Sequence, residues 1–566
     1  MRLRVLAFTL LLASVANVSV AAEFPDPKKG FDFSALSETP VLSGGRLKPL
    51  DSYAREVVLH VTGSRVFQGW NPVELMVSWA VAPALWEELN FILISRADVK
   101  RQIGVEERRS HFSPKELVEN SALAQYADRM GASASQPMQV GLAGAPKEDP
   151  REKELRAVME RVGMYRAVVS GDGWPLIPMP GDEAWHVLSS QEKDGGEEIR
   201  NPSAAMMISY REGKIEGFSK SVTAMGAAIL ARMENVTDRV HQSLRAEVFY
   251  NRFHPFRLAW VFYLFAVLAG ALALGFQATL KGRGEKILKA SCLTFAGTGV
   301  AVHVAGMVLR VFISERPPVT NMYESVIWVA FGAMVFGAIL FGVTRQLILM
   351  VCAAAVATIT LLIADSAPAV MDPSIRPLVP VLRSNLWLTI HVLTITLGYA
   401  AFALTLSLGN VTLFHYARLA LGRGGAGRQA KILNLNQLTY RATQFGVVLL
   451  AAGTILGGVW ADYSWGRFWG WDPKEVWALI ALLGYIAILH ARYTGWIGQF
   501  GYAAWTIVSF VLVLMAWYGV NFVLGAGLHA YGFSSGGQGT VAAFTFAQLA
   551  YVAVIAWLRK RKQAHS

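Results

Sequence analysis

Apolar residues dominate the second half of the chain, where only short polar links interrupt them. After His254, nine long apolar runs follow one another, near 256–278, 287–313, 325–344, 346–364, 386–414, 438–458, 476–494, 500–523 and 540–558. An apolar helix of about 20 residues can cross the hydrocarbon core of a bilayer. The pattern predicts a polytopic, mainly α bundle of about nine membrane-spanning helices, with only Thr344 and Arg345 between the third and fourth.

Residues 23–251 have a different character, with most of the acidic residues and several turn-forming clusters such as GDGWPLIPMPGDE at 171–183. This region is expected to be a water-soluble domain. Its most apolar segment, LMVSWAVAPALWEELNFILIS, contains Pro83, Glu87 and Glu88 where hydrocarbon would be. We therefore expect a buried helix followed by a strand rather than a span.

The first 22 residues begin with Arg2 and Arg4, continue with a short apolar run and end in small residues, Ala21 and Ala22. That order is typical of a secretory signal peptide, with an uncleaved anchor as the alternative. Four regions follow: residues 1–22 as the signal peptide, 23–251 as the soluble domain, 252–558 as the transmembrane domain and 559–566 as a basic tail.

Lys and Arg residues are distributed unequally between the two sides of the predicted bundle. One set of links holds Lys281, Arg283, Lys286, Arg345, Arg418, Arg423, Arg428, Lys431, Arg492 and the RKRK sequence at 559–562; the other holds Arg316, Arg376, Arg383, Arg467 and Lys474. The positive-inside rule makes the first side cytoplasmic. We expect a multi-pass protein of the plasma (inner) membrane, with the soluble domain outside and the C-terminus inside.

Composition fits this picture and excludes other classes. The chain is 54% hydrophobic and 16% charged, and its net charge of +12 is spread over membrane links, which gives no reason to expect nucleic-acid binding. Its two cysteines, Cys292 and Cys352, lie in predicted spans, and no CxxC or CxxCH occurs. The chain is therefore neither a thiol shuttle nor a covalent haem carrier.

Five tryptophans crowd into the stretch GVWADYSWGRFWGWDPKEVWAL at 458–479. Asp472, Pro473 and Glu475 have the spacing of a helix N-cap, first position and capping box, and Gly466 and Gly470 allow tight turns before them. An interfacial aromatic belt accounts for Trp460 or Trp477 singly. The crowding in one loop favours a shelf for a flat apolar ligand.

Two histidines suggest the ligand. His391 lies about one turn inside the outer end of its span, and His529 lies in an outer link, so both share the membrane face of the tryptophan loop. Two neutral imidazoles beside an aromatic shelf would ligate a haem iron axially. The alternative for either histidine is a hydrogen-bonded residue at a helix end.

The stretch WGRFWGWDPKEVWALI resembles the tryptophan-rich WWD motif of haem-handling membrane proteins. With the order His391, tryptophan loop, His490, His529, and with ERPPVTNMYES (315–325) and LHARYTGW (489–496), the region 255–558 resembles the CcsA (ResC) family of System II cytochrome c biogenesis. GGRLKPLDSYAREV (44–57) is similar to a segment ahead of the CcsA portion in long or fused members.

The resemblance implies a function in cytochrome c biogenesis: haem b is moved to the outer face and presented to the CxxCH thiols of apocytochrome c. It implies that His391 and His529 are the external axial ligands and that His490, about 21 Å into the membrane, ligates an intramembrane haem. The haem-binding loop would include the residues Trp460, Trp465, Trp469, Trp471 and Asp472. Arg467 and Lys474 are candidates for pairing with the propionates, with a solvated charge at the interface as the alternative for each, and Arg310 and Arg316 are weaker candidates.

The N-terminal region lacks the spans of the family's CcsB (ResB) portion. We therefore expect a separate CcsB-like membrane partner, with His303 as the alternative source of a second intramembrane ligand, and thiol-reducing proteins acting indirectly. The chain would be a component of a holocytochrome c synthase. A b-type cytochrome subunit for electron transfer and a haem exporter without ligation activity stay open as alternatives.

Overall fold

The computed structural model describes residues 24–133, 149–179, 184–190, 196–233, 237–277, 282–317, 319–368, 370–377, 385–422, 427–525, 527 and 536–564. These residues form two compact units. The expected signal peptide and His529 both lie outside the described residues.

The first unit takes its described residues from 24–41, 53–133 and 149–233 and is mainly helical. Its elements are α2 (Ser34–Glu38), most of α3 (Leu50–Thr62), α4 (Pro72–Val81), α5 (Pro83–Trp86), β3 (Ile92–Leu93), α6 (Ala97–Gln102), β4 (His111–Phe112), α7 (Pro114–Val118), α8 (Ser121–Ser133), α9 (Pro150–Ser170), α10 (Glu197–Glu212) and α11 (Ile215–Arg232). Strand β3 pairs antiparallel with β4. The expected buried helix followed by a strand is confirmed by α4 and β3.

Helix α4 begins at a well-formed cap and ends inside the aromatic core of this unit. The Asn71 side chain accepts hydrogen bonds from Val73 N and Glu74 N, and Pro72 occupies the first turn. Trp79 then stacks on Phe91 with ring centroids 5.3 Å apart. With ten residues, α4 is too short to cross a membrane.

A buried carboxylate ties α4 to α10. Glu74 Oε1 accepts hydrogen bonds from Lys28 N and from the Tyr210 hydroxyl, both at 3.0 Å. Burial raises the pKa of the Glu74 carboxyl above its ordinary value, and these two hydrogen bonds oppose the shift without cancelling it.

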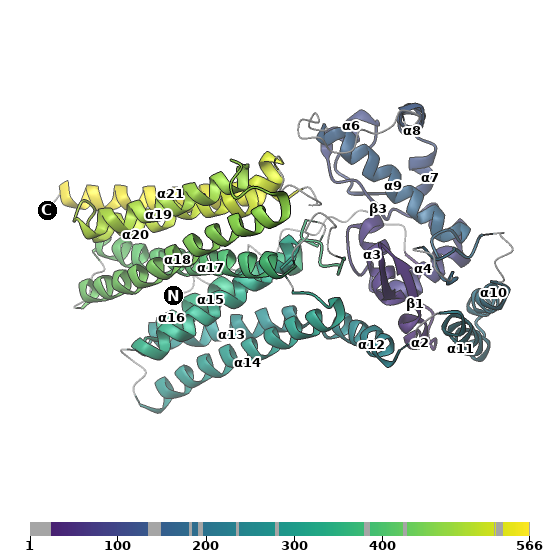
Figure 1. Ribbon diagram of the computed structural model, residues 1–566, viewed down its shortest axis with the longest axis horizontal. Coiled ribbons are helices and arrows are strands. Elements are labelled where there is room, and N and C mark those ends of the chain that lie inside the picture. The colour runs from purple at the N-terminus through teal and green to yellow at the C-terminus, as the bar shows by residue number, and fades with distance from the viewer. Residues whose placement is uncertain are drawn as a thin grey trace, which may run out of the picture. The chain divides into compact units, whose positions relative to one another are not determined.

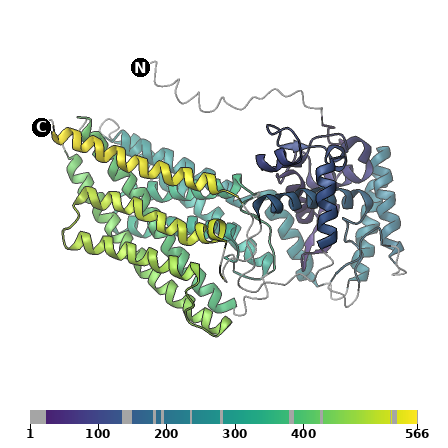
Figure 2. The same cartoon turned by 90° about the horizontal axis from the view of Figure 1, so that it is seen from above.

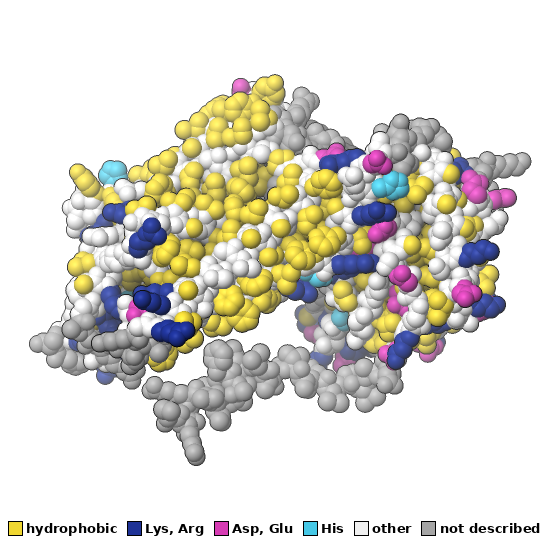
Figure 3. Space-filling model, turned by 90° about the horizontal axis from the view of Figure 1, so that it is seen from below, with side chains coloured by type: hydrophobic (Ala, Val, Ile, Leu, Met, Phe, Trp, Pro, Cys, Tyr) yellow, Lys and Arg dark blue, Asp and Glu magenta, His cyan; other side chains and the backbone are white. Residues whose placement is uncertain are grey.

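The second unit is the helical bundle (Figures 1 and 2). Within the described part of the chain, nine helical segments are long and apolar enough to cross a membrane, which confirms the expected bundle. They are α12 (Asp238–Phe253) continued by α13 (Pro255–Gly275), α14 (Arg283–Ser314), α15 (Met322–Thr344), α16 (Leu347–Ser366), α17 (Asn385–Ala420), α18 (Arg428–Trp465), α19 (Pro473–Tyr493), α20 (Gln499–Leu514) continued by the π-helix η1 (Met515–Leu524), and α21 (Gln538–Ala564). Hydrophobic side chains cover the length of the bundle, and Lys and Arg side chains gather at one end (Figure 3).

A segment from the beginning of the chain, Leu42–Ser52, also belongs to this unit. It contains part of β1 (Pro40–Ser43), its partner β2 (Arg46–Pro49) and the first residues of α3. Arg46 forms a bidentate ion pair with Glu247 of α12, with both N–O distances 2.7 Å. This fixes the GGRLKPL motif to the helix that leads into α13.

Two helix hairpins of the bundle show how consecutive spans are separated and how closely they pack. Helices α15 and α16 are separate, as expected, because Arg345 takes a left-handed conformation (φ 56°) after Thr344. Along α17 and α18 the backbones approach closely: a Cβ at Gly398 would lie 3.1 Å from Leu450 N, and one at Gly453 would lie 2.7 Å from Ile395 Cα. Such small-residue contacts are typical of packed membrane helices.

Candidate functional site

The close contact between α17 and α18 determines the position of His391. Its Nδ1 lies 2.8 Å from Gly453 O, and because a carbonyl oxygen only accepts, Nδ1 carries the proton. In the neutral imidazole the lone pair then resides on Nε2, the arrangement usual for metal-ligating histidines. Gly457 leaves room for the ring, since a Cβ there would lie 2.6 Å from His391 Cε1.

Trp460 and Trp465 are on the helix rather than in the loop. The apolar pattern places the end of this span near residue 458, but α18 continues to Trp465, because helical hydrogen bonding continues past the end of the apolar run. Trp460 is 1% exposed and lies parallel to the His391 ring, with centroids 6.2 Å apart and planes within 5°. Trp465 meets Trp460 edge to face at 4.7 Å.

The loop itself is short, from residue 466 to 472. Gly466 ends α18 in a left-handed conformation (φ 70°), as expected, whereas the second left-handed residue is Trp471 (φ 58°) rather than Gly470. Trp471 is 71% exposed and meets Trp469 edge to face, with ring centroids 6.0 Å apart. Gly470 instead makes room for the Arg467 side chain, because a Cβ at residue 470 would collide with the guanidinium as it is placed here.

The capping box at the start of α19 is confirmed. The Asp472 side chain accepts from Lys474 N at 2.9 Å, and Glu475 Oε2 accepts from Asp472 N at 3.1 Å. Glu475 also accepts from Gly470 N at 2.8 Å and lies 3.4 Å from Arg467 Nη1. One carboxylate therefore fixes both the loop and its arginine, and Arg467 pairs within the protein.

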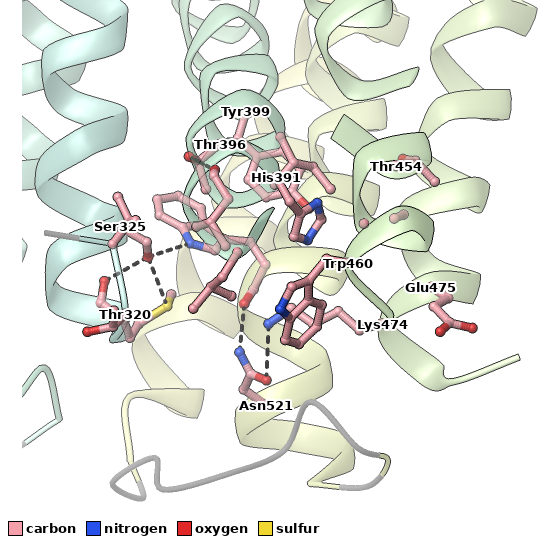
Figure 4. Close-up of a pocket in the computed structure, with 18 of the residues that line it drawn as sticks. Thr320, Ser325, His391, Thr396, Tyr399, Thr454, Trp460, Lys474, Glu475 and Asn521 are labelled. Carbon is pink, nitrogen blue, oxygen red and sulfur yellow. Dashed lines mark hydrogen bonds between the residues drawn. The ribbon is translucent and has the colours of Figure 1, made fainter. Parts of the chain in front are cut away.

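These elements surround a cavity that is open to the outside of the bundle (Figure 4). His391, Trp460, Trp469 and Lys474 all line it. Lys474 Nζ donates to Asn521 Oδ1 at 3.3 Å. An ammonium group in an otherwise mostly apolar cavity suits a flat ligand with a carboxylate edge.

Sequence reasoning missed one wall of the cavity. Trp517 and Asn521 line it from the π-helix η1, and the Trp517 indole donates to Ser325 Oγ at 3.0 Å. Thr320 and Ser325, from the ERPPVTNMYES stretch, line another side. The apolar pattern predicts a span here but carries no signal for a π-helix, which frequently marks a functional site.

The remaining predicted ligands are elsewhere or not described. Gly527, two residues before His529 in the sequence, lies against the capping box, since a Cβ there would be 2.3 Å from Asp472 Oδ2. His490 is exposed near the opposite end of α19, seventeen residues or about 25 Å from Pro473. His303 is fully buried in α14, with Nδ1 3.2 Å from the Tyr263 hydroxyl, and does not line the cavity.

Arg310 and Arg316 also do not line the cavity. Both pair with the fully buried Glu324: Arg310 Nε lies 2.8 Å from Oε1 and Arg316 Nη1 lies 3.0 Å from Oε2. Their other N–H groups bind backbone carbonyls in the segment 373–376. These arginines are internal structural groups, so the weaker suggestion of a propionate role for them finds no support in the geometry.

Comparison with known proteins gives consistent similarities. Residues 319–529 match the family model described as cytochrome C assembly protein. The chain is 33% identical over 300 residues to the cytochrome c biogenesis protein CcsA of Prochlorococcus marinus, a match that covers 47% of this chain and 91% of that protein. The chain belongs to the CcsA family. The CcsA of Guillardia theta is 37% identical over 237 residues, which are 38% of this chain and 76% of that protein.

The similarity to another relative includes the N-terminal unit. Protein NrfI of Wolinella succinogenes is 29% identical over 502 residues, which are 86% of this chain. The match covers 53% of NrfI, so the chain spans about half the length of that relative. The similarity to this relative therefore extends over the N-terminal unit as well as the bundle.

Proposed function

We propose that this chain binds haem in the cavity beside His391 and presents it for covalent attachment to apocytochrome c. The observation that carries the proposal is the geometry of His391, whose Nδ1–H is bound to Gly453 O at 2.8 Å while Trp460 lies parallel to the ring. Membership of the CcsA family supports haem as the substrate, and we propose that it is haem b.

The predicted site residues, of which His391, Trp460, Trp469 and Lys474 line the cavity, have distinct roles in this proposal. His391 supplies one axial nitrogen and His529 supplies the other. Trp460, Trp465, Trp469 and Trp471 provide the aromatic surroundings of the ring. Asp472 holds the loop against α19, and Lys474, which lines the cavity, pairs with a propionate. Arg467 acts through Glu475 and keeps the loop closed.

The attachment reaction requires the protein mainly to position the haem. Each apocytochrome thiol adds across a vinyl group, so a C–S bond forms and the hydrogen moves to the other vinyl carbon without an oxidant. The chain's contribution is to hold the haem with its vinyl edge accessible and its iron ligated until the histidine of CxxCH replaces one imidazole. The chain acts in this way as a component of a holocytochrome c synthase.

The proposed setting is the plasma membrane, with the cavity on the outer side and the C-terminus in the cytoplasm, as the distribution of Lys and Arg favours. A CcsB-like membrane protein is the proposed partner. His490 lies at the inner end of α19, exposed on this chain, where such a partner would supply the second ligand of an intramembrane haem.

The test is the absorption spectrum of the detergent-purified protein, co-expressed with its CcsB-like partner. We expect sharp reduced haem bands that weaken in His391→Ala, return with added imidazole and follow cytochrome c maturation in cells. His415→Ala is the matched control, because His415 is on the same helix but pairs with Arg428 away from the cavity.

A haem-free wild-type complex would refute the proposal. Haem bands with maturation unaffected by His391→Ala would favour a b-type cytochrome. Free release of haem to the outside without apocytochrome would favour a simple exporter.

A further inference from the structure

A second cavity lies at the other end of the bundle, where α17 and α21 end and α18 and α20 begin. Its volume is about 550 Å³. Its lining includes Tyr416 and Phe500, Gln429 and Gln499, and Arg559 and Lys562. No described residue that lines it is acidic, and the adjoining links carry the basic residues that place this end in the cytoplasm. The cavity is distinct from the one beside His391.

Arg559 is held by aromatic rings rather than by an acid. Its Cζ lies 4.8 Å from the Phe500 ring centroid and 5.7 Å from that of Tyr416, and these two rings meet edge to face. Across the described chain, no hydrogen-bond acceptor or carboxylate pairs with this guanidinium. Stacking fixes the planar group while its N–H edge stays available, the form that binds phosphate bidentately.

Two further donors border the same space. Lys562 Nζ donates to Leu419 O at 2.6 Å, which uses one of its three hydrogens. The side-chain carbonyl oxygen of Gln499 accepts a hydrogen bond from Asn436 Nδ2 at 2.8 Å. The NH₂ group of the same amide is the part of Gln499 that can donate to a ligand. Two cations and an amide therefore border one cavity.

The exposed aromatic residues give the depth of the cavity in the membrane. Tyr493 and Trp496 at the end of α19 are 84% and 83% exposed, and Trp557 on α21 is 57% exposed. Tyrosine and tryptophan of this kind sit at the headgroup level of a bilayer. The anion present at that depth is the phosphate of a phospholipid, and basic pockets between helix ends on the cytoplasmic side bind such headgroups.

We propose that this cavity is a binding site for the headgroup of an anionic phospholipid, with Arg559 as the phosphate ligand and Lys562 beside it. The proposal is independent of the haem site.

The experiment uses the full chain in detergent micelles with added phosphatidylglycerol, phosphatidylcholine or inorganic phosphate. Bound lipid is measured by native mass spectrometry. Arg559→Gln removes the charge. Arg559→Lys keeps the charge but loses the planar set of N–H donors that binds phosphate through two hydrogen bonds. Arg561→Gln is the matched control, because Arg561 is on the same helix and also lies over a ring, that of Trp557, but does not line the cavity.

We expect phosphatidylglycerol to bind the wild type in preference to phosphatidylcholine, and Arg559→Gln to weaken that binding roughly fivefold to tenfold. Arg559→Lys is expected to fall between, and Arg561→Gln to match the wild type, with haem bands unchanged in all three. Equal binding of phosphatidylcholine, or an equal loss in Arg561→Gln, would overturn the proposal. Inorganic phosphate that competes as strongly as the lipid would overturn the assignment to a lipid.

Discussion

The buried Glu324 should be among the most sensitive positions of the membrane unit. Glu324 is fully buried between Arg310 and Arg316, and it also accepts hydrogen bonds from the Thr320 amide and hydroxyl, both at 2.9 Å. Replacement by glutamine keeps the shape but removes the only negative charge in this cluster of described residues. Two guanidinium groups would then be buried with unbalanced charge.

The expected loss of stability in Glu324→Gln follows from the burial of its ion pairs. Removal of one partner from a buried ion pair costs about 3–5 kcal/mol, because the remaining charge stays desolvated. The matched control is Asp365→Asn, which breaks the pair between Asp365 and Arg257, whose side chains are 26% and 51% exposed. An exposed pair of that kind contributes roughly 0–1 kcal/mol. The two variants change net charge equally but differ in burial.

Thermal unfolding of the bundle can be followed with the two cysteines of the chain. Cys292 and Cys352, its two cysteines, are both buried, at 0% and 1% exposure. A thiol-reactive dye that fluoresces on coupling therefore reports thermal unfolding of the bundle. At roughly 2 °C per kcal/mol, the lower end of the usual range for a unit of this size, Glu324→Gln should lower the midpoint by about 6–10 °C and Asp365→Asn by at most about 2 °C. Equal midpoints for the two variants would refute the argument from burial.

Three further predictions test other features. Gly457→Ala should displace the His391 ring and reduce bound haem, whereas Gly342→Ala, a helical glycine with open space around it, should leave the haem spectrum unchanged. Asp472→Ala should destabilise the start of its helix by about 1 kcal/mol and weaken haem retention, measured by dilution of the loaded protein. The pKa of the Glu74 carboxyl is raised in the folded state, so the N-terminal unit loses stability as pH rises from the unfolded pKa to the folded pKa of this group; Glu74→Gln should slow hydrogen exchange of α4 at neutral pH but not in acid.

Much of the fold could be predicted because hydrophobicity is a long-range, repetitive signal. Nine apolar runs became nine candidate spans within the described residues, and the expected break at Thr344 and Arg345 is present one residue later, at Arg345 and Gln346. Helix ends were harder to predict, because apolar character and helical hydrogen bonding need not end together. Helix α18 therefore continues past the apolar run to Trp465 and carries Trp460 into the wall of the cavity.

Part of the candidate site could likewise be predicted from local sequence, and part of it could not. The capping box at Asp472 is a local pattern, so its spacing was sufficient to predict it. The contact between His391 Nδ1 and Gly453 O depends on how α17 packs against α18, and no local pattern carries that information. Asn521 was missed for a similar reason, since the π-helix that turns it toward Lys474 has no sequence signature here.

Two motifs that are far apart in the sequence act on one short segment. The carbonyls of residues 373–376, ahead of the helix that carries His391, accept hydrogen bonds from three arginines: Arg310 binds the first two, Arg46 the third and Arg316 the fourth. Glu247 pairs with Arg46, and Glu324 pairs with both Arg310 and Arg316.

The GGRLKPL stretch therefore stabilises the membrane unit itself, because Arg46 completes a set of contacts that the ERPPVTNMYES stretch begins. A chain that begins anywhere between Ser52 and Asn235 would lose this contact along with some or all of the N-terminal unit. Loss of function on removing the N-terminal region can therefore be attributed to that unit only if residues 42–52 are retained.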